Sequence, residues 1–160
     1  MIIAIHRIAL KALYGANAWQ TLEPVVKRYI DKLNSKGIPP GLLYLDDPKA
    51  SDLPNADPAE SGDASAAAEL IRAKALRMQV LPAAVLLVGG HEAIPMHELP
   101  NPPNEHPSDK DTHILTDNPY GCLTAVRNRY VFPDLAVGRI AAGSGDGIKD
   151  IVDQLERAIR

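Results

Sequence analysis

The chain has 160 residues, a net charge of −3, 46% hydrophobic residues and 23% charged residues. This length suits one compact unit with its own core, so we take residues 1–160 as a single α/β subdomain. The weak acidity gives no reason to expect nucleic acid or a membrane surface as a partner. No apolar run approaches the ~20 residues of a membrane-spanning helix. The single cysteine, Cys122, excludes an internal disulfide framework and fits a cytoplasmic location.

The first 46 residues predict a helix between two apolar segments. Residues 2–10 are compatible with a strand or with the start of a helix, because their hydrophobic pattern favours neither period. A helix is predicted from Asn17 or Thr21 up to Gly37, which acts as a left-handed cap. Pro24 is placed in its first turn, where the missing N–H costs nothing. A short buried strand over 41–46 follows.

The middle of the chain predicts a loop, a helix and a buried strand. Residues 47–63 are rich in proline and small polar residues, which predicts a flexible loop. A helix follows from about Asp63 or Ser65 to Gln79. Pro82 ends it, and the sequence AAVLLVGG then indicates a strand that is buried on both faces.

The last third predicts a long loop, a strand and a helix. Residues 91–130 are mostly polar and form the loop, and a strand is expected at 134–138. An amphipathic helix over 147–159 begins at the N-cap candidate Asp146. Its apolar stripe consists of Ile148, Ile151, Val152, Leu155 and Ile159.

This alternation of helices and strands predicts an α/β fold with a mostly parallel sheet flanked by helices. Ligand sites in such sheets lie beyond the carboxyl ends of the strands. Gly89 and Gly90 lie just past such an end and allow a sharp turn. The loop over 91–130 is therefore expected on the functional face.

Several common sites fit the sequence poorly. The segment GGHEAIP is not a dinucleotide-binding motif, since Pro95 prevents a helix from starting at the phosphate. The segment GSGDG at 143–147 precedes a helix and is compatible with an anion site, although a turn with an N-cap explains it as well. Cys122 is compatible with a nucleophile, but no histidine stands in a defined relation to it, so a core cysteine is the default.

Four histidines and two aspartates in the long loop are compatible with a zinc site. The spacings between these histidines match no known ligand pattern, so we predict no metal and no cofactor. The residues concerned are His91, His97, His106, His113, Asp109 and Asp111.

The order of four segments resembles the N-terminal part of the gingipain-like cysteine peptidases, of the caspase-type clan. These segments are the strand LLVG followed by Ile94 and Pro95, the turn containing Asp117 and Tyr120, the strand DLAVGRI, and the helix IVDQLERAIR. The resemblance covers about residues 63–160. The family's catalytic histidine and cysteine lie in later motifs that do not occur here, so no catalytic residue is carried over.

The resemblance implies the N-terminal subdomain of a cysteine endopeptidase that hydrolyses peptide bonds, after a basic residue, in a protein or peptide substrate. A C-terminal half or a partner chain would supply the Cys–His dyad, and this chain alone would be inactive. An alternative is a non-catalytic α/β module that serves interaction or regulation. A small-molecule-binding flavodoxin-like domain would need a phosphate-binding turn that the sequence lacks.

Arg139 follows Gly138 at the end of a predicted strand, and a partly buried guanidinium needs a carboxylate partner. Asp117 is the first candidate for this structural ion pair, with Asp111 and Asp134 as rivals. We also expect Asp117 and Tyr120 to line a substrate cleft. The alternative is that these two residues only hold the loop and lie far from the substrate.

An isolated half of a peptidase is expected to expose surfaces that the other half would cover. One sheet edge would be open, and the apolar face of the helix at 147–159 would be exposed. A dimer or a partner chain would cover that side.

Overall fold

The computed structural model describes residues 1–101, 111–124, 132–143 and 147–160. A parallel four-stranded sheet in the order β2-β1-β3-β6 forms its centre. The strands are β1 (Ile2–Ile5), β2 (Gly41–Tyr44), β3 (Ala84–Val88) and β6 (Ala136–Ile140). The predicted α/β class with a parallel sheet is confirmed.

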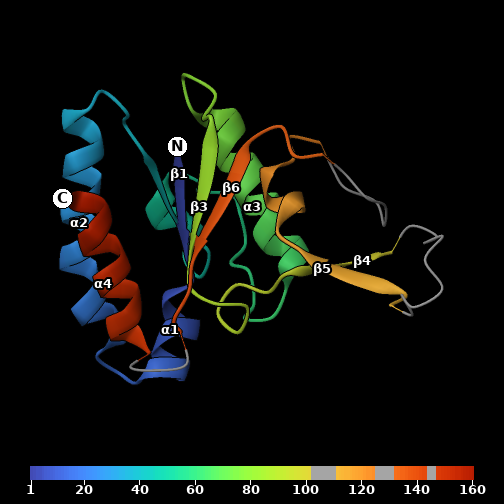
Figure 1. The fold of residues 1–160 in the computed structure, drawn as a ribbon. Helices are drawn as coiled ribbons and strands as arrows, with labels where there is room; N and C mark the ends of the chain where they lie inside the picture. The colour runs from blue at the N-terminus through green and yellow to red at the C-terminus, as the bar shows by residue number, and fades with distance from the viewer. Residues whose placement is uncertain (102–110, 125–131, 144–146) are drawn as a thin grey trace.

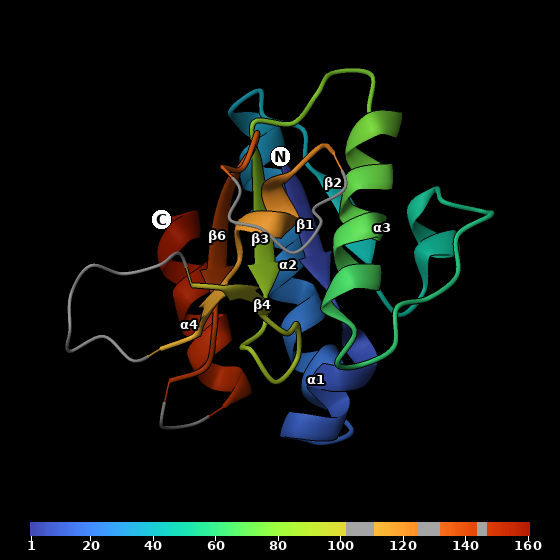
Figure 2. The ribbon, with the colours of Figure 1, turned by 90° about the vertical axis from the view of Figure 1, so that its right-hand side faces the viewer.

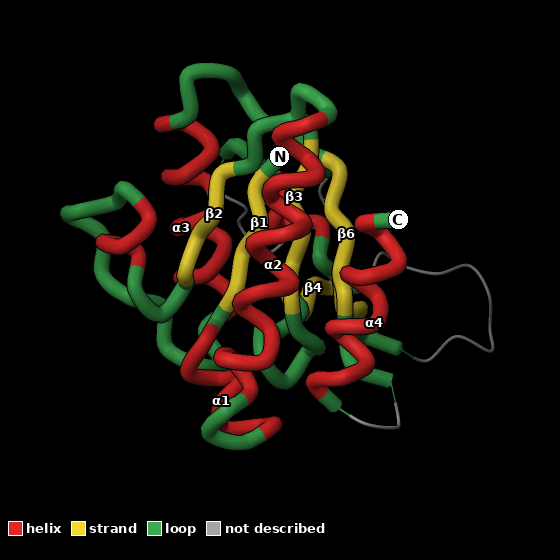
Figure 3. The backbone as a smooth tube through the Cα atoms, turned by 90° about the vertical axis from the view of Figure 1, so that its left-hand side faces the viewer, coloured by secondary structure: helices red, strands yellow, loops and turns green. Residues whose placement is uncertain are grey.

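Helices cover both faces of this sheet. Helices α2 (Ala18–Ser35) and α4 (Ile148–Ile159) lie on one face, as Figure 3 shows, and α3 (Ala64–Arg77) lies on the other face (Figures 1 and 2). Helix α1 (Arg7–Tyr14) follows β1 directly. All four residues of the central strand β1 are fully buried, as expected for a strand with both faces covered. None of the described helices is long and apolar enough to cross a bilayer.

The apolar segment at 2–10 contains both a strand and the start of a helix, the two possibilities that its sequence allowed. Strand β1 ends at Ile5, and the buried His6 begins α1 by accepting a hydrogen bond from the Ala9 N–H on its Nδ1. Helix α2 starts at Ala18, so the placement of Pro24 in the first turn is wrong: Pro24 lies inside the helix. The helix continues because the carbonyl that Pro24 leaves unpaired belongs to Gln20, which is exposed to water.

Three predicted elements lie within two residues of their expected bounds. Helix α3 begins after the N-cap Asp63, whose carboxylate accepts the Ala66 N–H at 2.8 Å. Strand β6 starts two residues later than expected. Helix α4 begins after Gly147, while the proposed cap Asp146 lies outside the described residues.

The segment at 47–63 is partly packed. It contains the 3-10 helix η1 (Pro48–Ser51), and Leu53 and Ala59 are buried in the core. Lys74 of α3, which is 8% exposed, donates to the Ser51 carbonyl at 2.7 Å. The flexibility of this segment stays a prediction.

The segment at 91–130 is not a loop throughout. Its described part contains an antiparallel hairpin of β4 (His97–Pro100) and β5 (His113–Thr116), followed by the 3-10 helix η2 (Asn118–Gly121). The hairpin projects from the body of the molecule (Figure 1), and η2 lies over the sheet beside α3 (Figure 2). Four-residue strands are too short for their periodicity to show in the sequence.

The helix at 147–159 is not exposed in the way that we expected. Ile151 and Leu155 of α4 are fully buried, because the helix packs against α2 and β6. Arg28 of α2 and Glu156 of α4 form an ion pair beside this contact. The sheet edge does agree with the expectation, since β6 pairs with β3 on one side and has no second strand among the described residues.

Candidate functional site

A sharp turn follows the carboxyl end of β3. Gly89 has a φ of +134°, and a Cβ there would lie 2.8 Å from the Ala93 side chain, so the turn requires glycine. The Gly90 carbonyl accepts the N–H groups of Ala93 and Ile94, both at 3.0 Å. Ala93 and Ile94 are fully buried, which fixes the turn against the core.

Arg139 of β6 binds this turn from the neighbouring strand. Its Nη1 donates to the carbonyl oxygens of Gly89 at 2.9 Å and Ile94 at 2.8 Å. Its Nε and Nη2 donate to the two carboxylate oxygens of Asp117 at 2.9 and 2.6 Å. The side chain of Arg139 is 9% exposed and that of Asp117 is 20% exposed. We call this group of Arg139, Asp117 and the two carbonyls the Arg139 clamp.

The clamp brings together Arg139 and Asp117, as the sequence predicts. A forked guanidinium suits this task, because it satisfies a carboxylate and two carbonyls in one plane. The rival Asp134 instead accepts the Leu123 N–H at 2.8 Å. The rival Asp111 is exposed and precedes β5, where its carbonyl accepts from the Asn101 side-chain amide at 2.8 Å.

Tyr120 of η2 adds a second attachment to the same turn. Its hydroxyl donates to the Pro95 carbonyl, and the side chain is 1% exposed. Burial raises the pKa of the Tyr120 phenol well above its usual value, so the hydroxyl stays a donor. The structure therefore places Tyr120 beneath the surface, and the roles of Tyr120 and Asp117 in lining a cleft stay predictions.

Close packing sets the position of η2 against β6. A Cβ on Gly121 would lie 2.4 Å from the Leu135 carbonyl, so only glycine fits there. The Gly121 carbonyl accepts the Leu135 N–H at 2.9 Å. Cys122 follows, 6% exposed, with its Sγ 3.4 Å from the Asn118 carbonyl. Burial raises the pKa of this thiol, which is the opposite of what a nucleophile needs.

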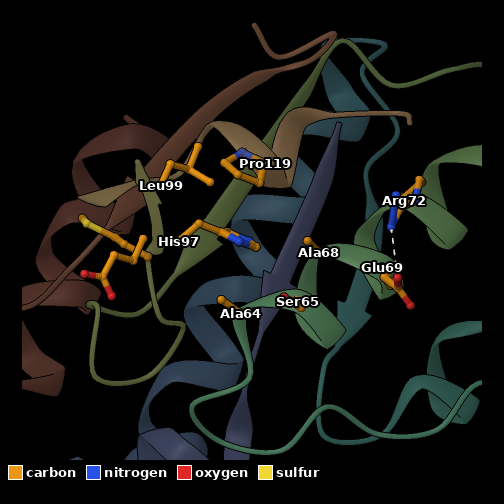
Figure 4. A pocket seen from close by; sticks show the side chains of 10 residues that line it. Ala64, Ser65, Ala68, Glu69, Arg72, His97, Leu99 and Pro119 are labelled. Atoms are coloured by element: carbon orange, nitrogen blue, oxygen red, sulfur yellow. Dashed lines mark ion pairs between the residues drawn. The ribbon is translucent and has the colours of Figure 1, made fainter. Parts of the chain in front are cut away.

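A polar groove lies beside the clamp, between α3 and β4 (Figure 4). Its volume is about 220 Å³. We call it the α3–β4 groove, and its lining residues are Ala64, Ser65, Ala68, Glu69, Arg72, Met96, His97, Glu98, Leu99 and Pro119. The small side chains at 64, 65 and 68 leave the space on the helix side.

His97 connects the groove to Tyr120. Its ring packs edge-on against Tyr120, with the ring centroids 4.9 Å apart. Burial lowers the pKa of His97, although the carboxylates of Asp117 and Asp63 and the backbone of Ala64 act in the opposite direction. Sequence reasoning did not assign His97 to this place, and it did not single out Arg72 at all.

The described loop histidines, His91, His97 and His113, have separate surroundings. His91 accepts the Met96 N–H at 3.0 Å, and His113 lies on β5 beside Glu98. Within the described ranges, no three potential ligands among His, Cys, Asp and Glu come together. His106 and Asp109 lie outside the described residues. Of the segment at 143–147, Gly143 donates its N–H to the Asp150 carboxylate at 3.0 Å, and 144–146 are not described.

The comparison with family models decides the family. The model of peptidase family C25 matches residues 49–158, which is more than half of the chain. The chain belongs to peptidase family C25. The matched region contains α3, β3, the clamp, the groove and β6, so the features described above are part of the family's region of the chain.

Solved structures of gingipains share this fold. A complex of the pro- and mature domains of RgpB from Porphyromonas gingivalis matches with a TM-score of 0.58 and 21% identity, over 99% of this chain and 28% of that one. The Arg-specific cysteine proteinase gingipain R (RgpB) matches with a TM-score of 0.57 and 21% identity, over 99% and 27%. The chain thus spans little more than a quarter of these relatives. No curated protein matches it.

Proposed function

We propose that this chain is the N-terminal subdomain of a gingipain-like cysteine endopeptidase. The observation that carries the proposal is the match of peptidase family C25 to residues 49–158. The Cys–His dyad would come from another segment of the protein. Among the described residues, Cys122 contacts the carbonyls of Asn118 and Phe132 and has no histidine partner, which supports this assignment.

The clamp has a clear task within such an enzyme. It fixes the turn after β3 and the start of η2 at the carboxyl ends of the strands, where α/β proteins place their ligands. A rigid platform at this edge would support the loops of a neighbouring catalytic segment. Cleavage after a basic residue is the specificity that we propose, in line with the resemblance to an Arg-specific relative.

The test uses the longest natural form of the protein with arginyl and lysyl reporter peptides, with and without iodoacetamide. We expect hydrolysis of these peptides and its loss on alkylation. A Cys122→Ser variant is the matched control and should keep its activity, because the thiol at 122 is buried. Absence of hydrolysis, insensitivity to alkylation, or inactivity of the control would each contradict the proposal.

The second candidate is a non-catalytic α/β interaction module, which the α3–β4 groove favours. A natural form that lacks hydrolysis but binds peptides would select this candidate. A dimer formed over the free edge of β6 stays a prediction, and size-exclusion chromatography with light scattering tests it.

A further inference from the structure

One edge of β4 has no strand partner among the described residues. Strand β4 pairs with β5 in the register His97↔Thr116 to Pro100↔His113. The Asn101 N–H donates to the Thr112 carbonyl at 2.8 Å, which identifies that pair as hydrogen-bonded. Bonded and non-bonded pairs alternate in an antiparallel ladder, so the Glu98 N–H and carbonyl point away from β5. Glu98 also lines the α3–β4 groove.

The opposite wall of the groove presents the Arg72 guanidinium, which makes no hydrogen bond to the described residues. The side chain of Arg72 is 17% exposed, and its ion-pair partner, Glu69, lies 3.7 Å away, beyond hydrogen-bonding distance. Glu69 itself is 73% exposed, so this contact is weak. A mostly buried guanidinium retains strong affinity for a carboxylate that binds it in a forked geometry.

A buried imidazole nitrogen also lies at this groove. The Nε2 atom of His97 is buried and has no hydrogen-bond partner in the described part of the chain. Buried polar groups normally have a partner, so an unpaired one needs an explanation. The side chains of His97 and Leu99 share one face of β4, while the Glu98 side chain points to the other face. The groove therefore combines one strand edge, one guanidinium and one imidazole.

We propose that the α3–β4 groove binds an extended segment of another polypeptide as a strand beside β4, with an acidic side chain of that segment on Arg72. The Glu98 N–H and carbonyl would bond its backbone, as in other cases of strand addition. The charge on Arg72 selects the acidic residue. The volume of about 220 Å³ is below that of typical drug-sized pockets, and it suits a few residues of extended chain. This proposal goes beyond the peptidase activity and does not depend on it.

The binding test uses fluorescence anisotropy of labelled hexapeptides with the 160-residue chain. The probes are Thr-Val-Glu-Val-Thr-Val, its Gln counterpart, and versions of the Glu peptide that are N-methylated at one backbone amide each. We expect the Glu peptide to bind at least about tenfold more tightly than the Gln peptide, as for a charge-assisted bond of about 1.4 kcal/mol or more. Methylation of the amide that faces Glu98 should reduce affinity by a similar factor.

An Arg72→Leu variant should lose the preference for Glu over Gln, while the control Arg77→Leu, on the same helix, should keep it. Near-UV circular dichroism verifies that both variants are folded. Amide NMR shifts on titration should centre on Glu98.

Equal affinity for the Glu and Gln peptides, no binding at millimolar concentration, or a preference that survives Arg72→Leu would overturn the proposal. Shifts centred on Val137 at the β6 edge would do so too. Because no hydrolysis is measured, this outcome is separate from that of the peptidase test.

Discussion

The two faces of the sheet are held by different forces. On the α2–α4 face, apolar side chains of two long helices pack against the strands, and Leu22, Ile151 and Leu155 are fully buried. On the opposite face, η2 and the turn after β3 lie over β3 and β6. These short segments are attached by the hydrogen bonds of Arg139 and Tyr120.

Apolar packing and directional hydrogen bonds contribute differently to the fold. Apolar burial is roughly proportional to area and tolerates repacking, so it stabilises the fold without fixing any one loop conformation. A bidentate ion pair with two further carbonyl bonds is directional, and it defines where the turn after β3 lies. The α2–α4 face is therefore stabilised by apolar burial, whereas the clamp fixes the position of the turn after β3 on the other face. The predictions below test this division.

The largest loss of stability is expected for Ile151→Ala in α4. The variant removes a fully buried side chain at the α2–α4 contact and leaves a cavity, which should lower the free energy of unfolding by about 3–4 kcal/mol. Urea unfolding followed by circular dichroism measures this. Amide exchange should rise across the whole chain, and a loss confined to α4 would contradict the expected cooperativity.

Arg139→Ala should cost about 2–3 kcal/mol, because it leaves Asp117 and two carbonyls without their donor. Unlike the core variant, it should increase hydrogen exchange first in the turn after β3 and in η2. The matched control is Arg157→Ala on α4, where an exposed guanidinium donates to the Asp153 carbonyl and to no other described residue. Equal melting temperatures for the two variants would contradict a stabilising role for the clamp.

Tyr120→Phe should cost about 1 kcal/mol, since it removes one hydrogen bond and keeps the ring. Its unfolding should also become less sensitive to alkaline pH. The pKa of Tyr120 is raised in the folded state, so its contribution is complete below pH 10 and is lost as the pH rises above that value. Thermal melts at pH 8 and pH 11 compare the variant with Tyr29→Phe, which should behave as the wild type does.

The smallest effect is expected for His97→Leu, as a change in acid sensitivity. Burial lowers the pKa of His97 in the folded state, so its contribution to stability is present above pH 6.5 and is lost as the pH falls through the folded-state value. The wild type should therefore lose more stability between pH 7.5 and pH 5.5 than the variant. The same pH dependence in both proteins would place the acid sensitivity on another histidine.

The sequence was sufficient to predict the helices and strands that depend on local signals. The apolar run before Gly89 predicted β3, the apolar stripe at 147–159 predicted α4, and an alanine-rich run after Asp63 or Ser65 predicted α3. A guanidinium placed at a strand end requires a carboxylate, so Asp117 was named as the first candidate partner of Arg139.

Other features arose only from the tertiary structure. The hairpin strands have four residues each, which is too few for a periodic signal, and α4 is buried by a helix more than a hundred positions away in the sequence. Arg72 and His97 both line the α3–β4 groove, although strand β3 lies between them in the sequence. Composition and spacing along the chain determine which segments become strands and helices. Which polar groups meet, and which are left without a partner, depends on how those segments pack, because such contacts are long-range.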